Sequence, residues 1–549
     1  MKKAGAGQSS AERLRLAKES MKTFRDRIIK APSLVWAVMV ALVLGSAEGI
    51  HLVSLDSLSR FPVFQDGIQA VAGQRYFLSD AWRWPLLDTR FFFAPNGASV
   101  AMTDSTPLLL LLFKPFVSLL PAGFVPYRLW LVFCFIMQPI SAVLALASAG
   151  ERRFPALISG ALLALCMPFF LGRIIHLSLM GQFLLLLAFA LYFSLVRIRT
   201  WALILTPPFL VVCLLIHPTL MLLSFGIIAS ASLTLLCGRQ KEWRGVACSC
   251  AAGVAMVLTV SGALGYFRYA QGAGGYGLFS MNLLSPIWPM HSDLLGHFPE
   301  LHYGLQTQSF EGYAYLGTGL LVLLACDMVF CRRALLNAAR RHAGMSIFLG
   351  LLILYAASNT GYAGAYRLWH ISLSPPFSDV LRASGRCFWP VGYGLLIAGV
   401  RSSRFLSWPV GNGMLILCAL LQFLDTRSLR GQAHDLWKAD FPRTSDTQTL
   451  TGLIASARQV ALYPVAGCGL DLYGPDTDRI MTVFRLSAEQ SRPINTFYLS
   501  RSPKKFSCDH EIPPIEQKPG TLEIYVSGSQ PLAGRHCRDV NQLKVCPSE

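Results

Sequence analysis

The sequence predicts an α-helical polytopic membrane protein that ends in a small soluble α/β domain. Of the 549 residues, 53% are hydrophobic and only 14% are charged, against about 25% charged in an average soluble protein. Residues 31–424 form a series of apolar runs of about 15 to 22 residues, which is the length a bilayer requires. After Leu424 the composition changes to strand-like runs between turn residues.

The apolar runs predict about eleven spanning helices, separated by short polar clusters. Their predicted ranges are 33–54, 127–149, 155–172, 179–196, 201–217, 219–237, 244–265, 313–330, 344–358, 387–400 and 404–424. Residues 1–30 predict a basic amphipathic helix on the cytoplasmic leaflet, since Ser9 and Glu12 have capping-box spacing and apolar residues then recur at helical spacing. This stretch is too polar and too long to be a cleavable signal peptide.

The run Pro107–Leu120 is the ambiguous one, because it is short and interrupted by Lys114 and Pro115. If it does not cross, five positive clusters fall on the side of the N-terminus, as the positive-inside rule requires. These clusters are Arg152/Arg153, Arg197/Arg199, Arg239/Lys241/Arg244, Arg332/Arg333/Arg340/Arg341 and Arg401/Arg404. We therefore predict a re-entrant or interfacial helix at 107–120, an inner (cytoplasmic) membrane location in a bacterium and a cytoplasmic N-terminus.

The net charge of +18 is explained by this topology, and no nucleic-acid-binding module is visible. Membrane lipids, not nucleic acid, are the predicted surroundings. The topology places three long loops outside, at 55–126, 266–312 and 359–386, together with the segment 425–549. Loops of this length commonly carry function.

The segment 425–549 predicts a small extracytoplasmic α/β domain. Its strand-like runs are Gln459–Pro464, Arg479–Phe484 and Thr521–Ser527. It holds four cysteines in a compartment where disulfides persist, with connectivity left open: Cys468, Cys508, Cys537 and Cys546.

Asp66 is the first candidate for chemistry, because it lies in the first outer loop close to the membrane and begins a predicted helix ahead of Gly67. As a structural residue it would cap that helix or remain a solvated loop acid. As a functional residue it would stand free at the membrane surface. The sequence features around Asp66 decide between these two roles.

The same loop and its neighbours resemble the GT-C class of membrane glycosyltransferases. The resemblance is carried by a membrane-proximal acid, a proline-led apolar helix, paired helices with basic inner turns and an outer C-terminal domain. The segments PNGASVAMTDSTPL, HLSLMGQF and LRASGRCFW are similar to stretches of an uncharacterised bacterial branch of that class.

This resemblance implies a glycosyltransferase that moves a sugar from a polyprenyl-phosphate donor to an envelope glycan or lipid acceptor at the outer face. Asp66 corresponds in position to the general base that takes the acceptor proton. Arg382 and Arg386 lie four residues apart before an outer helix end, so they would face one side and bind the donor phosphate. Anchoring lipid headgroups is the alternative role for both arginines.

Further polar residues on the outer side are candidate substrate contacts. Glu48 and His51 are three apart, and mutual pairing would also satisfy them. Asp104 could equally cap the helix that follows it, and His176 and Gln182 flank a short outer turn. From the loop 266–312 come His291, Asp293, His297, His302 and Glu311.

The irregular spacing of these last residues gives only weak support to a divalent metal site, so no cofactor is firmly predicted. Two alternatives to the enzyme remain: a lipid or polysaccharide transporter, and a non-catalytic subunit of an envelope polysaccharide assembly machine. A transporter would favour charged or broken elements at the bilayer midplane and internal repeats, and neither is evident in the sequence.

Overall fold

The computed structural model describes residues 33–53, 59–269, 276–301, 310–372, 378, 380–442, 444–501, 519–526, 529, 531 and 536–547. The predicted basic helix 1–30 and the candidate His302 lie outside the described residues.

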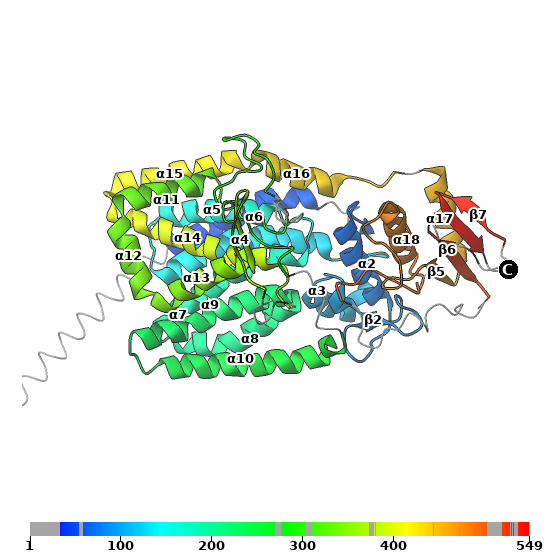
Figure 1. The fold of residues 1–549 in the computed structure, drawn as a ribbon. Coiled ribbons are helices and arrows are strands. Elements are labelled where there is room, and N and C mark those ends of the chain that lie inside the picture. The colour runs from blue at the N-terminus through cyan, green and yellow to red at the C-terminus, as the bar shows by residue number, and fades with distance from the viewer. Residues whose placement is uncertain are drawn as a thin grey trace, which may run out of the picture.

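The described chain is mostly helical and forms a long bundle with a small sheet at one end, confirming the predicted fold class (Figure 1). Within the described ranges, six helices are long and apolar enough to cross a membrane. They are Ser33–Leu52, α4 (Tyr127–Ala149), η5 with α7 (Ser178–Gln182 and Phe183–Val196), α9 (Pro218–Cys237), α10 (Trp243–Ala263) and α15 (Trp408–Asp425). The chain is therefore a multi-pass membrane protein.

Shorter helices occupy the other predicted spans. They are α5 (Phe154–Leu165) with α6 (Pro168–Leu171), α8 (Thr200–Ile216), α11 (Thr318–Phe330), α13 (Ala343–Ala357) and α14 (Trp389–Ser402). The basic helix α12 (Arg332–Arg341) links α11 to α13 at the end of the bundle far from the sheet (Figure 1).

The junction between α8 and α9 shows how the sequence sets a helix boundary. His217 precedes Pro218, and a residue before proline is disfavoured in the helical conformation; its φ of −161° and ψ of 132° are extended. The imidazole then caps α9, because His217 Nδ1 accepts from the backbone N–H of Thr219 at 3.0 Å. The other ring nitrogen, Nε2, lies 3.9 Å from Asp104 Oδ1 in the first long loop.

Next to the sheet lies the first long loop, which contains α2 (Gln65–Ser79), the strand pair β1 (Asp88–Thr89) and β2 (Ala98–Ser99), and η3 (Val100–Met102) (Figure 1). The ambiguous run forms α3 (Pro107–Phe113) and η4 (Lys114–Leu119). At 1.5 to 2 Å rise per residue these two reach roughly 20 to 25 Å, short of the about 30 Å of a bilayer core.

Several small elements complete the connections between the helices and the link to the C-terminal domain. They are η1 (Ile50–Leu52), η6 (Tyr266–Arg268), the hairpin β3 (Thr360–Ala363) and β4 (Tyr366–His370), η7 (Ser384–Phe388), η8 (Ser403–Phe405) and α16 (Arg427–Lys438). Helix α16 runs from the bundle toward the soluble domain (Figure 1).

The C-terminal domain contains α17 (Ser445–Ser456), β5 (Gln459–Tyr463), α18 (Thr477–Glu489), β6 (Thr521–Tyr525), β7 (Arg538–Val540) and β8 (Leu543–Pro547). Its sheet has the order β5-β6-β8-β7, with β5 and β6 parallel and the other neighbours antiparallel. Cys537 and Cys546 form a disulfide, and Cys468 is also disulfide-bonded. Cys508 lies outside the described residues.

One strand prediction in this domain was wrong: Arg479–Phe484 lies inside α18. The buried residues Ile480, Val483 and Phe484 recur at helical and not at strand spacing. Asp478 in the first turn favours the helix by its interaction with the macrodipole. The β-branched and aromatic residues suggested a strand, but their period is that of a helix.

The C-terminal domain packs on the first long loop. Helix α18 lies against α2, and Phe497 stacks on Phe92 at 4.9 Å between ring centroids while meeting Tyr76 edge-on. Ile494 forms a parallel bridge with Phe92. Because these aromatic residues are buried, the soluble domain and the loop that carries Asp66 share one core.

Candidate functional site

A buried ion-pair network joins Glu311, Arg386 and Arg173. Glu311 binds Arg386 in a fork, with Nε and Nη2 donating at 2.9 and 2.7 Å to its two carboxylate oxygens. Arg173 donates from Nη1 to the same carboxylate at 3.1 Å. Burial opposes ionisation of Glu311, but the two guanidinium groups outweigh it and lower the pKa of the carboxyl. The network carries one net positive charge.

Asp66 lies in the first turn of α2, where Phe64 occupies the N-cap position and no side chain caps the helix. The capping role considered from the sequence is therefore not observed. The pKa of Asp66 is raised to about 6. Burial is the main cause, Glu311 also raises it, and Arg386 lowers it. The carboxylate and Arg386 therefore belong to one electrostatic site.

His176 stands between the two acids. Its Nε2 lies 3.4 Å from Asp66 Oδ2 and 3.6 Å from Glu311 Oε1. Burial is the main cause that lowers the pKa of His176 to about 3; Glu311 opposes this and Arg386 adds to it. The ring is therefore neutral at pH 7, and a proton placed on Nε2 would face both carboxylates.

Asp104 belongs to the same cluster through a strained turn. Asp104 and Thr106 adopt positive φ values of 56° and 54°, a region that is costly for residues other than glycine. Ser105 Oγ donates to the carbonyl of Ala70 at 2.7 Å, and Gln74 Nε2 donates to the carbonyl of Ser105 at 3.1 Å. These bonds hold the turn against α2, the helix that carries Asp66.

The carboxylate of Asp104 faces a second set of side chains. Ser178 donates to one oxygen, and His217 Nε2 lies 3.9 Å from the same oxygen. Burial is the main cause that raises the pKa of Asp104 to about 7; Asp66 also raises it, while Ser178 and Arg386 lower it. Asp104 Oδ2 and the hydroxyl of Tyr266 are buried without a hydrogen-bond partner among the described residues. Buried polar atoms of this kind mark a place where a ligand or water completes the bonding.

Arg382 and Arg386 differ in their surroundings. Arg386 is occupied by Glu311, whereas the guanidinium of Arg382 lies over the ring of Phe279 at 5.5 Å. Burial raises the pKa of Tyr498 in the C-terminal domain; the charge of Asp66 raises it further, and the charge of Arg382 lowers it. Arg382 is therefore within electrostatic reach of the C-terminal domain.

Other predicted site residues have different partners. Glu48 pairs with Arg430 at 2.6 Å, not with His51, whose ring instead meets His434 of α16. Gln182 accepts from the hydroxyl of Tyr393 at 2.8 Å within the bundle. These side chains are satisfied by neighbouring helices and are not gathered around Asp66.

The loop residues His291 and Asp293 also lie elsewhere. Asp293 Oδ2 accepts from the backbone and hydroxyl of Ser428 at 2.7 and 2.9 Å, at the start of α16. His291 contacts His297. Within the described part of the chain, no group of three His, Cys, Asp or Glu side chains could hold a metal ion. Asp104, considered as a cap, is not the N-cap of α3; that residue is Thr106, and no side chain caps the helix.

Sequence reasoning did not single out Arg173, His217, Ser178 or Tyr266. Two signals were available. Arg173 interrupts the apolar run PFFLGRII, and an ionisable group at that depth requires a partner or a role. His217 precedes a proline between two apolar helices. The chain leaves the helical conformation there, so the polar side chain is free to contact a neighbouring loop.

Comparison with solved structures gives a match titled "Crystal Structure of ArnT from Cupriavidus metallidurans bound to Undecaprenyl phosphate". The two chains are 12% identical over 94% of this chain and 98% of that one, with a TM-score of 0.49. No curated protein matches the sequence. One family model matches residues 34–427, from the first span to the start of α16, and it is described as a domain of unknown function, DUF6311. Because the match covers most of its length, the chain belongs to the DUF6311 family.

Proposed function

We propose that the chain is a glycosyltransferase that moves a sugar from a polyprenyl-phosphate donor to an envelope glycan or lipid acceptor at the outer face of a bacterial inner membrane. The observation that carries the proposal is Asp66, a carboxylate with a pKa of about 6 beside Arg386 and His176. A base whose pKa lies near the working pH is largely ionised at that pH and still has a high affinity for the proton it takes.

In the proposed reaction an acceptor hydroxyl attacks the anomeric carbon of the donor sugar. The new bond joins the acceptor oxygen to that carbon, and the bond from the carbon to the phosphate oxygen breaks. Asp66 takes the hydroxyl proton, and polyprenyl phosphate leaves with the bonding electrons. Asp66 is therefore assigned the role of general base.

The cationic side of the site suits the leaving phosphate. Arg382 is the arginine we assign to direct phosphate binding, because no carboxylate occupies it among the described residues. Arg386 and Arg173 are held in place by their ion pairs with Glu311, and the three groups together carry a fixed positive charge. Preorganised charge of this kind stabilises the negative charge that develops on a leaving group.

His176 and Asp104 are assigned positioning roles. Neutral His176 orients the Asp66 carboxylate through Nε2. Asp104, Ser178 and Tyr266 present hydrogen-bonding atoms to the substrate, in keeping with the unpartnered atoms of Asp104 and Tyr266. No metal or other cofactor enters this proposal.

The test incubates the purified full-length protein with a panel of polyprenyl-phosphate sugars and an envelope glycan extract, and measures release of polyprenyl phosphate. We expect release with one donor, lost in Asp66→Asn and retained in Asp478→Asn, an exposed carboxylate on α18. If no donor is turned over, the transporter and the non-catalytic subunit become the better accounts.

A further inference from the structure

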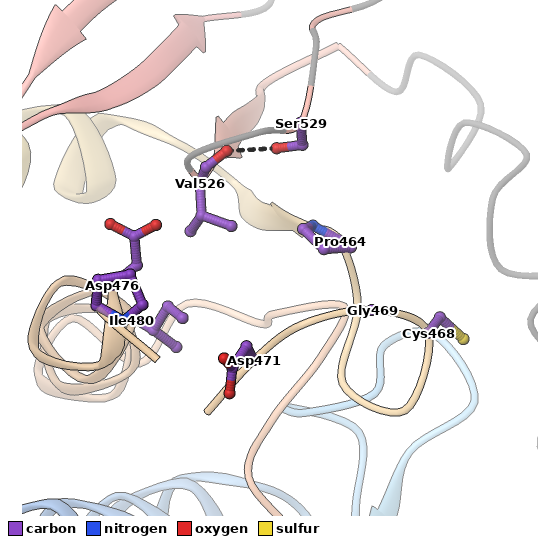
Figure 2. A pocket seen from close by; sticks show the side chains of 9 residues that line it. Pro464, Cys468, Gly469, Asp471, Asp476, Ile480, Val526 and Ser529 are labelled. Carbon is purple, nitrogen blue, oxygen red and sulfur yellow. Dashed lines mark hydrogen bonds between the residues drawn. The ribbon is translucent and has the colours of Figure 1, made fainter. Parts of the chain in front are cut away.

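The C-terminal domain has a cavity of its own, with a volume of about 500 Å³. Figure 2 shows it between the segment that follows β5, the first turn of α18 and the segment that follows β6. Among the residues that line it are Pro464, Asp471, Asp476, Ile480, Val526 and Ser529. A volume of this size accommodates a small organic ligand.

The topology explains why a cavity forms here. Strands β5 and β6 are parallel, so both end at the same edge of the sheet, and Pro464 and Val526 directly follow them. The chain leaves β5, crosses the edge and enters α18. Crevices outside the carboxyl ends of parallel strands are the usual binding places of open α/β sheets.

The lining chemistry restricts the ligand. Among the described residues, its lining has two carboxylates, Asp471 and Asp476, no Lys or Arg, and apolar surface from Pro464, Ile480 and Val526. Asp476 is paired with Arg479, which does not line the cavity. An anionic ligand is disfavoured by the carboxylate of Asp471. A metal ion is not favoured either, since no three ligating side chains come together in the described part of the chain. Carboxylates accept hydrogen bonds from hydroxyls, and apolar surface suits the C–H face of a sugar ring.

The cavity is connected to the Asp66 site by direct contacts. Gln65, the residue before Asp66, donates from Nε2 to the carbonyl of Leu472 at 2.8 Å, one residue after Asp471. The hydroxyl of Tyr473 lies 2.7 Å from that of Tyr498, and Gln69 of α2 donates to the carbonyl of Tyr498 at 2.9 Å. Tyr473 is 76% exposed, so its ring is open for stacking between the two sites.

We infer that this cavity is a subsite for an uncharged, hydroxyl-rich sugar residue of the acceptor, with Tyr473 guiding the chain from the cavity toward Asp66. This inference rests on the proposed function. It gives the C-terminal domain the task of selecting the acceptor, and it identifies the acceptor as a saccharide.

Binding is measured on the full-length protein in detergent by saturation-transfer NMR, with glucose, galactose, mannose and N-acetylglucosamine and their β-linked disaccharides as probes. We expect saturation transfer to at least one probe, reduced at least fivefold in Asp471→Asn and in Ser529→Phe, which narrows the cavity. Asp478→Asn is the matched control, because Asp478 lies on the same helix turn as Asp476 but does not line the cavity. Absence of binding in the wild type, or equal binding in both lining variants, overturns the inference.

Turnover separates this inference from the proposed function. Asp471→Asn should raise the acceptor KM at least fivefold with little change in kcat and in the donor KM. If Asp66→Asn abolishes transfer while Asp471→Asn and Ser529→Phe leave the acceptor KM unchanged, the subsite is refuted and the enzyme stands. If the lining variants lose sugar binding but no donor is turned over, the cavity stands and the transferase is refuted.

Discussion

At Asp66, burial and the neighbouring Glu311 favour the protonated carboxyl, while Arg386 favours the ionised one. The outcome is a pKa of about 6, above the ordinary value of 3.8. Ionised Asp66 is thus less favourable in the folded protein than in the unfolded chain above about pH 6. A functional residue held at a cost to stability is common at active sites.

Replacing Asp66 by Asn should therefore stabilise the protein in a pH-dependent way. Because the folded pKa is raised, the penalty is fully present above about pH 6 and disappears as the pH falls to the unfolded value of 3.8. Thermal unfolding in detergent should show Asp66→Asn melting higher than wild type at about pH 8, with the gap closing toward about pH 4. A wild type that is the more stable protein at high pH would contradict this assignment.

Replacing Glu311 should destabilise the protein, because its carboxylate compensates the charges of two buried arginines. Glu311→Gln leaves Arg173 and Arg386 without their carboxylate, and breaking a buried pair in this manner costs about 3–5 kcal/mol. We expect a lower melting temperature and reduced yield, whereas the exposed Glu300→Gln should change neither. An unchanged melting temperature in Glu311→Gln would show that the network contributes little.

Prediction of these residues from the sequence was partial for a physical reason. Asp66, Arg382 and Arg386 stand out because they lie on the predicted outer side, whereas most basic residues beside the apolar runs gather on the predicted inner side. The partnership of Arg173 with Glu311 spans 138 residues, and the only local signal for it is a single arginine in an apolar run. Glu48 and His51 were predicted as substrate contacts, with mutual pairing as the alternative. In the structure Glu48 pairs with Arg430 of α16, 382 residues away in the chain, and helix packing over such a separation leaves no local sequence signal.

At the scale of elements, the contact between α2 and the turn of Asp104 joins the two halves of the site. Gly73 permits this approach: a Cβ atom at that position would lie 2.3 Å from Ser105 Oγ and 2.4 Å from Thr103 Oγ1. Both hydroxyls are buried and hydrogen-bonded, so they cannot give way freely.

Gly73→Ala should therefore displace the Asp104 turn and lower both stability and turnover. Overpacking of this kind costs about 1–3 kcal/mol. The matched control is Gly452→Ala in α17, where a Cβ meets nothing within 4 Å and the substitution should stabilise by about 0.5–1 kcal/mol. The measurement is the melting temperature and the initial rate of each variant. Equal melting temperatures and equal rates in the two variants would refute a tight contact between Gly73 and the Asp104 turn.

The elements were predictable where hydrophobic period and length act alone. The apolar runs became helices close to the predicted boundaries, since no tertiary contact is needed to identify them. Arg479–Phe484 was misread because its β-branched and aromatic residues suit a strand, whereas their burial against α2 follows the helical period. The docking of α18 on α2 is a long-range contact that local patterns do not encode.

For the whole molecule, basic α12 lies at one end of the bundle, and α2, α18 and the sheet lie at the other (Figure 1). This arrangement fits a cytoplasmic α12 and an outer C-terminal domain, as the positive-inside rule predicts. An alkaline phosphatase fusion after Glu549 should be active, and a fusion after Arg341 should be inactive. The reverse pattern would place the Asp66 site on the cytoplasmic side and contradict the proposed reaction.

The most direct test of the account is the pH dependence of polyprenyl phosphate release in wild type and Asp66→Asn. If Asp66 is the general base, the wild-type rate should rise through the pKa of about 6 and level off above it. The variant should be slower by about 10²–10⁴-fold and lack this rise. A variant that keeps the wild-type rate and pH profile would remove Asp66 from the mechanism and contradict the account.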